Sequence, residues 1–303
     1  VELAQRTGNF DVRYGSKVTG IMMGDDGLAT GLRYIDLATG EEHEQPADLV
    51  ILSGFTMTNV RMLLLSGSNS HPDGVGNNQG MVGKNYTYQL LGTPATGFFE
   101  GRRFNQYMGN AGVGVAIADL NADNFDHGDL DFIGGASVTC GGGAREPLTS
   151  TLGLPLLDEE TFGDYEDAES DPSVGPGLST DFGPLSGSGV EWGSAWKENL
   201  RNNWDSYLGI GIQGESLPYE DQFMDLDPVY KDAWGQPLLR LTYDFHDNDR
   251  RLYAYLAARV TEIMEEMGPT SMSVTDELDP YNIHEYQSTH NTGGAIMGDD
   301  PAS

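Results

Sequence analysis

The residues best suited to chemistry lie near the C-terminal end of the sequence, around His290. This histidine stands in a run of small residues and glycines over 288–298, where a planar ligand could approach the backbone closely. An imidazole, with an unperturbed pKa of about 6.5, is a natural base for a hydroxyl proton. Taken alone, the pattern does not outweigh a structural role for this histidine.

The remaining candidates for metal or thiol chemistry are weaker. The single cysteine, Cys140, can form no intramolecular disulfide and supplies no thiolate cluster. The other histidines show no ligand spacing, so no metal site is predicted. His43, His71 and His127 lie in polar, turn-like contexts. His246 precedes a predicted helix as a cap or core-edge residue, and His284 lies in a loop.

Two further motifs are weighed against simpler interpretations. Residues 209–214 match G-x-G-x-x-G, but Pro218 follows and no helical periodicity comes after it, so a glycine-rich strand is predicted. Residues 119–131 begin like a calcium loop, yet Asn124 and Leu130 stand where glycine and a bidentate acid are needed. A turn is favoured there, and a non-catalytic acidic module for cation binding or protein interaction stays open as the alternative function.

The charge of the chain excludes several classes of partner. Its 303 residues hold 47 Asp and Glu against 16 Lys and Arg, a formal charge of −31, and only four of the cations are lysine. This field repels phosphate backbones and anionic lipids, so neither nucleic acid nor membrane surface is an expected partner. The alternatives are an ordinary acidic protein and a halophilic adaptation to concentrated salt, and we favour the second because the acidic residues are spread along the whole chain. A local acidic loop is expected at 158–181, and no stretch reaches the roughly 20 apolar residues of a membrane span.

Hydrophobic patterns predict the elements that would position these residues. We expect a short strand at 10–14 and a hairpin of strands 18–23 and 31–35. The apolar run 48–54 predicts a strand buried on both faces, and helical spacing follows it over 59–67. Short β segments dominate from about 80 to 243. A helix then follows, with Asp247 or Asn248 as its N-cap and a stop at Gly268-Pro269, and it carries one apolar stripe: Leu252, Leu256, Val260, Ile263 and Met267.

Six stretches, in colinear order, resemble the glucose–methanol–choline (GMC) flavin oxidoreductases, and within them the flavoprotein subunits of gluconate 2-dehydrogenase. The last of them is similar to the family pattern H-x-x-G-T-x-x-M-G, with Gly294 where many members have threonine. The stretches are 48–67, 82–86, 124–127, 192–197, 230–237 and 290–298.

The resemblance implies an α/β (α+β) fold: part of a Rossmann-like FAD-binding domain interleaved with a mainly antiparallel-sheet substrate domain. The FAD part would comprise 1–80 and 250–303, and the substrate domain 81–249. His290 matches the catalytic histidine of the family, while Asn85 carries over less securely. The positions that match cofactor contacts are Val18, Ser53, Gly54, Asn291 and Thr292.

The activity implied by the resemblance is oxidation of a CH–OH group in an alcohol, sugar or sugar acid. His290 would remove the hydroxyl proton while hydride passes to flavin N5. An electron-acceptor subunit, cytochrome or quinone-linked, is a possible partner. The family's pyrophosphate loop and second catalytic residue have no match here, so we expect an internal fragment that is inactive by itself. Cytoplasmic and exported locations both stay open.

Overall fold

The computed structural model describes residues 1–104, 114–141, 194, 197, 201–202, 204–278, 280–281 and 290–299. The chain forms two compact units: unit 1 is 1–87, 218–243 and 291–303, and unit 2 is 88–217 and 244–290. The predicted acidic loop at 158–181, His284 and most of the 192–197 stretch lie outside the described residues.

The described residues of unit 1 form two small sheets, one short helix of a single turn and one helix of about three turns. The predicted hairpin is confirmed: β1 and β2 pair antiparallel, with Val18 opposite Tyr34, and β3 continues the sheet in the order β1-β2-β3. The helix predicted at 59–67 is also present, although it begins earlier. The elements are α1 (Glu2–Gln5), β1 (Ser16–Met23), β2 (Ala29–Asp36), β3 (Glu42–Pro46), α2 (Thr56–Leu65), β8 (Phe223–Lys231) and β9 (Pro237–Thr242).

The predicted strands at 10–14 and 48–54 are wrong, because the structure has no strand in either range. Segment 48–53 runs without regular structure, and two of its large apolar side chains are exposed: Leu49 is 74% and Ile51 is 76% exposed. The apolar composition predicted a strand here, but no segment among the described residues pairs with this one in a sheet. A strand requires a hydrogen-bonding neighbour as well as suitable side chains.

The turn between β8 and β9 is tied to β1 and α2 by a partly buried charge cluster around Asp232. One carboxylate oxygen of Asp232 accepts hydrogen bonds from the ammonium of Lys17 and, at 2.9 Å, the guanidinium of Arg61. The other oxygen accepts the backbone N–H groups of Trp234 and Gln236 at 2.9 and 3.0 Å. Lys17 also lies 3.7 Å from the centre of the Trp234 ring, a cation–π contact. These contacts join three elements that are far apart in the sequence.

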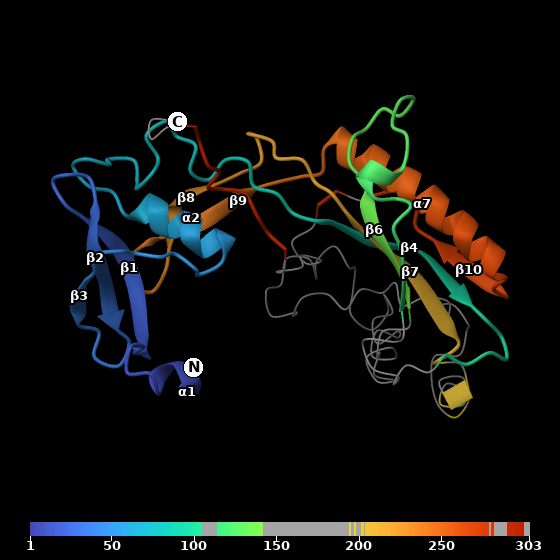
Figure 1. Cartoon of the computed structure of the whole chain (residues 1–303), viewed down its shortest axis with the longest axis horizontal. Coiled ribbons are helices and arrows are strands. Elements are labelled where there is room, and N and C mark those ends of the chain that lie inside the picture. Colours follow the sequence, from blue (N-terminus) through green and yellow to red (C-terminus); the bar gives the residue numbers. More distant parts are fainter. Residues whose placement is uncertain are drawn as a thin grey trace. The chain divides into compact units, whose positions relative to one another are not determined.

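Unit 2 is built on a five-stranded antiparallel sheet in the order β10-β4-β7-β6-β5 (Figure 1). The glycine-rich segment 209–214 forms part of β7, so the prediction of a strand in place of a dinucleotide loop is confirmed. The elements are β4 (Leu90–Phe98), β5 (Gly114–Ile117), the 3₁₀ turn η1 (Ala122–Asn124), β6 (Ala136–Gly141), β7 (Tyr207–Gly214), α7 (Asp247–Met267) and β10 (Ser271–Val274).

Helix α7 lies against this sheet and ends at Gly268, as predicted (Figure 1). Leu252, Leu256 and Val260 of the predicted stripe are fully buried, whereas Ile263 and Met267 are only partly buried. The N-cap is His246, not Asp247 or Asn248; its backbone N–H donates to Asp249 Oδ2 at 2.9 Å, and burial raises the pKa of that carboxyl. The core of unit 2 is therefore one helix face packed against one sheet face.

The described chain is thus a mixed helix and strand fold with antiparallel sheets. Among the described residues, no helix has the length and hydropathy that crossing a bilayer requires.

The Asp232 cluster predicts a pH-dependent contribution to stability. Burial alone would raise the pKa of Asp232, but the hydrogen bonds from Lys17, Arg61, Gln236 and Trp234 outweigh it and hold this pKa well below the ordinary value. A carboxyl with a depressed folded-state pKa stabilises the fold above its unfolded value of about 3.9, and this stability is lost as pH falls through the folded value.

We therefore expect Asp232→Asn to lower the free energy of unfolding by about 2–3 kcal/mol near neutral pH. This loss lies between the small effect of breaking a solvent-exposed salt bridge and the larger effect of breaking a buried one. The loss should shrink as the pH falls below about 4. Urea unfolding of the purified protein measures both effects. The control is Asp225→Asn, which breaks the more exposed pair with Arg240. Equal losses in the two variants would contradict a special role for Asp232.

Candidate active site

The predicted base, His290, lies at the start of a short loop, 290–294, and its side chain is exposed. Its backbone has φ +68°, in the left-handed region that non-glycine residues rarely occupy. Such a conformation costs about 1–3 kcal/mol and persists only where neighbouring contacts enforce it. The loop that follows His290 supplies those contacts.

The residue after His290, Asn291, is buried and held at both of its oxygens. The hydroxyl of the fully buried Tyr86 donates to Asn291 Oδ1, and Thr56 Oγ1 at the start of α2 donates to the Asn291 carbonyl oxygen at 2.7 Å. Asn291 is therefore fixed by two residues from separate segments of unit 1.

The next residues of the loop pair with segment 83–87 through the backbone. Thr292 and Thr87 exchange two N–H···O bonds of 3.0 and 3.1 Å, as a residue pair does in an antiparallel ladder. Gly83 N–H donates to the Gly294 carbonyl at 2.6 Å, and Met224 N–H donates to the Gly83 carbonyl at 2.8 Å. Three segments that are remote in the sequence thus share one hydrogen-bonded layer.

Two glycines make this close approach possible. A side chain at Gly293 would overlap the Asn85 carbonyl oxygen, and one at Gly294 would meet Met224 Cε at 2.5 Å and Val60 Cγ2 at 2.7 Å. Both glycines also have positive φ, 76° and 71°. Glycine 294, which departs from the threonine of the resembled pattern, is buried against neighbouring side chains that leave no room for one.

Ser53 and Gly54 lie in the turn that leads into α2, and both are exposed. Asn59 of α2 holds this turn: its Oδ1 accepts the Gly54 N–H at 2.9 Å, and its Nδ2 donates to the Leu52 carbonyl at 3.4 Å. Thr56 follows directly and contacts Asn291. The structure therefore brings Ser53, Gly54 and the 290–294 loop to the same end of α2.

Val18 is placed differently. It lies in the middle of β1 and is partly buried. A hydrogen bond from the Ile21 N–H to Ser66 Oγ, 2.8 Å long, links β1 to the residue after α2. This link is at the C-terminal end of the helix, whereas Ser53, Gly54 and Asn291 are at its N-terminal end.

Sequence reasoning assigned no role to Tyr86, Thr56 or Thr87, which hold the loop. A signal existed for Tyr86, because it belongs to the quoted 82–86 stretch and a buried tyrosine normally directs its hydroxyl to a partner. No comparable signal existed for Thr56 or Thr87, since their contacts join residues 235 and 205 positions apart.

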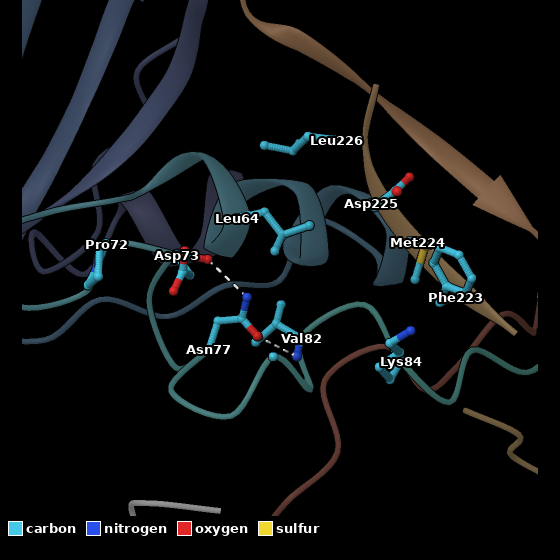
Figure 2. Close-up of a pocket in the computed structure, with 11 residues that line it drawn as sticks. Leu64, Pro72, Asp73, Asn77, Val82, Lys84, Phe223, Met224, Asp225 and Leu226 are labelled. Atoms are coloured by element: carbon cyan, nitrogen blue, oxygen red, sulfur yellow. Dashed lines mark hydrogen bonds between the residues drawn. The ribbon is translucent and has the colours of Figure 1, made fainter. Parts of the chain in front are cut away.

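Unit 1 also contains a cavity of about 490 Å³ beside this layer (Figure 2). Figure 2 shows Leu64 of α2, Asp73 and Asn77 of the following loop, and Phe223 to Leu226 of β8 around it. Asn77 Nδ2 donates to the Asp73 carbonyl at 2.9 Å, and Lys84 Nζ lies 4.1 Å from the centre of the Phe223 ring. None of the sequence-predicted site residues lines this cavity.

The other sequence candidates gain no support for ligand chemistry. In the 119–131 loop, Asn124 Nδ2 donates to the Ala118 carbonyl at 2.6 Å and Asp126 Oδ1 accepts the Gly128 N–H at 2.8 Å, the turn-like pattern that was favoured. Over the described ranges, no three His, Cys, Asp or Glu side chains are grouped in a way that could hold a metal ion. Burial raises the pKa of the Cys140 thiol, which makes it a poor nucleophile near neutral pH.

Comparison with known proteins confirms the resemblance to the GMC oxidoreductases. Residues 218–303 match the family model described as GMC oxidoreductase. Over 96% of its length, the chain is 36% identical to a gluconate 2-dehydrogenase flavoprotein from Pantoea cypripedii. It is 28% identical over 91% of its length to a 2-methyl-1,2-propanediol dehydrogenase from Mycolicibacterium austroafricanum, and 22% identical over 86% to a fructose dehydrogenase large subunit from Gluconobacter japonicus.

The chain spans 42%, 43% and 39% of the lengths of these three relatives. The relatives are oxidoreductases by their names, and the mixed fold with antiparallel sheets agrees with the C-terminal, substrate-side part of a GMC protein.

The loop geometry predicts a severe effect of Gly293→Ala. A side chain there suffers the conformational cost of positive φ, about 1–2 kcal/mol, and also overlaps the Asn85 carbonyl, which adds about 1–3 kcal/mol or more. Gly40→Ala is the matched control, because Gly40 has φ +75° but no atom within 4 Å of an added Cβ. Thermal and urea unfolding should show a loss at position 293 at least twice that at position 40; equal losses would refute the close approach.

Proposed function

We propose, on the premise that this chain is related to the GMC oxidoreductases, that the full-length protein is an FAD-dependent oxidoreductase. Its proposed substrate is the CH–OH group of a small alcohol, sugar or sugar acid. The observation that carries the proposal is the 290–294 loop, in which an exposed histidine has a left-handed backbone conformation. The two residues that follow it are held by hydrogen bonds from Tyr86, Thr56 and Thr87. The match over 218–303 contains this loop.

The residues around the loop fit a flat, polar cofactor. Ser53 and Gly54 are exposed and present little side chain, and Thr292 is exposed beside His290. We assign Ser53, Gly54, Asn291 and Thr292 to FAD binding, with Val18 contributing from β1. When bound, FAD would supply the acceptor for the hydride that leaves the substrate carbon.

His290 is the proposed general base. One of its imidazole nitrogens takes the substrate hydroxyl proton and holds it as the C–H bond is broken. Its exposed position leaves room for a substrate, and the fixed backbone of Asn291 restricts where the imidazole can point. General-base catalysis of this kind contributes about 10²–10⁴-fold to a rate.

The proposed domain division assigns 1–80 and 250–303 to a partial Rossmann-like FAD domain and 81–249 to the substrate domain. Support comes from segment 48–53, whose exposed Leu49 and Ile51 are suited to burial beneath neighbouring strands of a larger sheet. The compact units divide the chain differently: residues 218–243 and 291–303 accompany 1–87, and residues 244–290 accompany 88–217.

The substrate class and partners are inferred from relatives. Their names specify gluconate, 2-methyl-1,2-propanediol and fructose, which are small hydroxylated molecules. One relative is named as a large subunit, and on that basis an electron-acceptor subunit is a proposed partner for this protein too.

We expect His290→Ala in the full-length protein to slow flavin reduction by substrate about 10²–10⁴-fold, because the proton acceptor is lost. Visible flavin absorbance should be retained, which separates loss of chemistry from loss of cofactor. The measurement is anaerobic stopped-flow bleaching, with His43→Ala as control, because His43 lies in the exposed strand β3. A reduction rate unchanged by His290→Ala removes this residue from the base role.

We also propose that the protein works in concentrated salt, on the strength of its charge of −31. At 1 M salt the Debye length is about 3 Å, so repulsion between surface carboxylates is screened and the folded state gains stability. The melting temperature of the full-length protein should rise steadily as KCl is raised toward this range. A melting temperature that falls with salt contradicts the proposal.

A further inference from the structure

The side chain of Tyr86 is rigidly held beside the candidate base. It is fully buried, its backbone N–H donates to the Gln222 carbonyl at 3.0 Å, and its ring meets Tyr243 edge-on, with ring centres 5.6 Å apart. Its neighbour Asn85 is itself in the left-handed region, at φ +58°. The phenol hydroxyl is therefore presented at one position, where it donates to Asn291 Oδ1.

The hydrogen bond acts on the residue that shares a peptide bond with His290. A rotation of Asn291 turns that peptide and changes the direction of the histidine side chain. Thr56 Oγ1 fixes the Asn291 carbonyl on one side, and Tyr86 fixes its side chain on the other. Together they hold Asn291, the residue that directly follows His290 and its left-handed φ of +68°.

The loop has other attachments that do not need Tyr86. The Thr87–Thr292 pair and the Gly83–Gly294 hydrogen bond are made entirely by backbone atoms. Removing one hydroxyl leaves these bonds in place, so the loop stays docked. The hydroxyl of Tyr86 differs from these attachments because it acts on the residue adjacent to His290.

We propose that Tyr86 is a positioning residue for catalysis: through Asn291, its hydroxyl orients the His290 imidazole toward the substrate hydroxyl. The inference rests on the proposed function, because it assumes that His290 is the base. A misplacement of a reacting group by about 1 Å can cost about 10²-fold in rate, so a positioning residue has a measurable kinetic effect without touching substrate.

The test is a double-mutant cycle in the full-length, FAD-loaded protein. Tyr86→Phe keeps the ring and removes the hydroxyl; it should slow the limiting rate of flavin reduction about 10–100-fold, with little change in the substrate concentration at half-maximal rate. In a His290→Ala background the same substitution should have no further effect, since residues that act as one unit are not additive. The control is Tyr253→Phe, at a buried tyrosine of α7.

The outcomes separate this inference from the function on which it rests. If His290→Ala does not slow the reaction, the proposed function fails. If His290→Ala slows it but Tyr86→Phe does not, or slows it equally in both backgrounds, the positioning role fails and the proposed function stands.

A readout without turnover uses ¹³C-labelled histidine and NMR. The His290 imidazole signal, assigned by its loss in His290→Ala, should shift in Tyr86→Phe, because its orientation changes. It should stay in place in Tyr253→Phe. An unmoved His290 signal in Tyr86→Phe overturns the positioning role whatever the kinetics.

Discussion

Unit 1 depends on the close backbone approach between segments 83–87 and 291–294. The Thr87–Thr292 pair, the Gly83–Gly294 bond and the bond from Met224 to Gly83 form one layer from three parts of the chain. That layer exists because residue 293 is glycine, since any side chain there would occupy the Asn85 carbonyl. The buried Tyr86–Asn291 contact lies in the same part of unit 1, directly before the paired residues.

A second constraint is the use of scarce positive charge. The chain has 16 Lys and Arg, yet Lys17 and Arg61 both pair with one partly buried carboxylate, Asp232. A single cation would offset less of the cost of removing this carboxylate from water, because its side chain is only 12% exposed. The cluster fixes the β8–β9 turn against β1 and α2, and β8 carries Met224 into the layer beneath the histidine loop.

Local patterns in the sequence were sufficient where the element depends on its own residues. The hairpin of β1 and β2, helix α2, helix α7 with its stop at Gly268, and the glycine-rich β7 could all be predicted from period and turn chemistry. The strand at 48–54 could not, because a strand also needs a partner and apolar composition does not supply one. The resemblance predicts site roles for His290, Asn291 and Thr292, whereas no sequence signal pointed to Thr56 or Thr87, since their contacts join residues more than 200 positions apart. Their position in the site is a property of the fold.

The central claim is that the histidine loop serves the oxidation of a CH–OH group in an FAD-dependent protein. The most direct measurement is anaerobic mixing of the full-length protein with gluconate, fructose or a small diol, each also prepared with deuterium on the CH–OH carbon. At least one substrate should bleach the visible flavin absorbance, and deuterium should slow this bleaching several-fold because the C–H bond breaks in that step. A protein that carries no flavin, or bleaching at the same rate with both isotopes under single-turnover conditions, would contradict it.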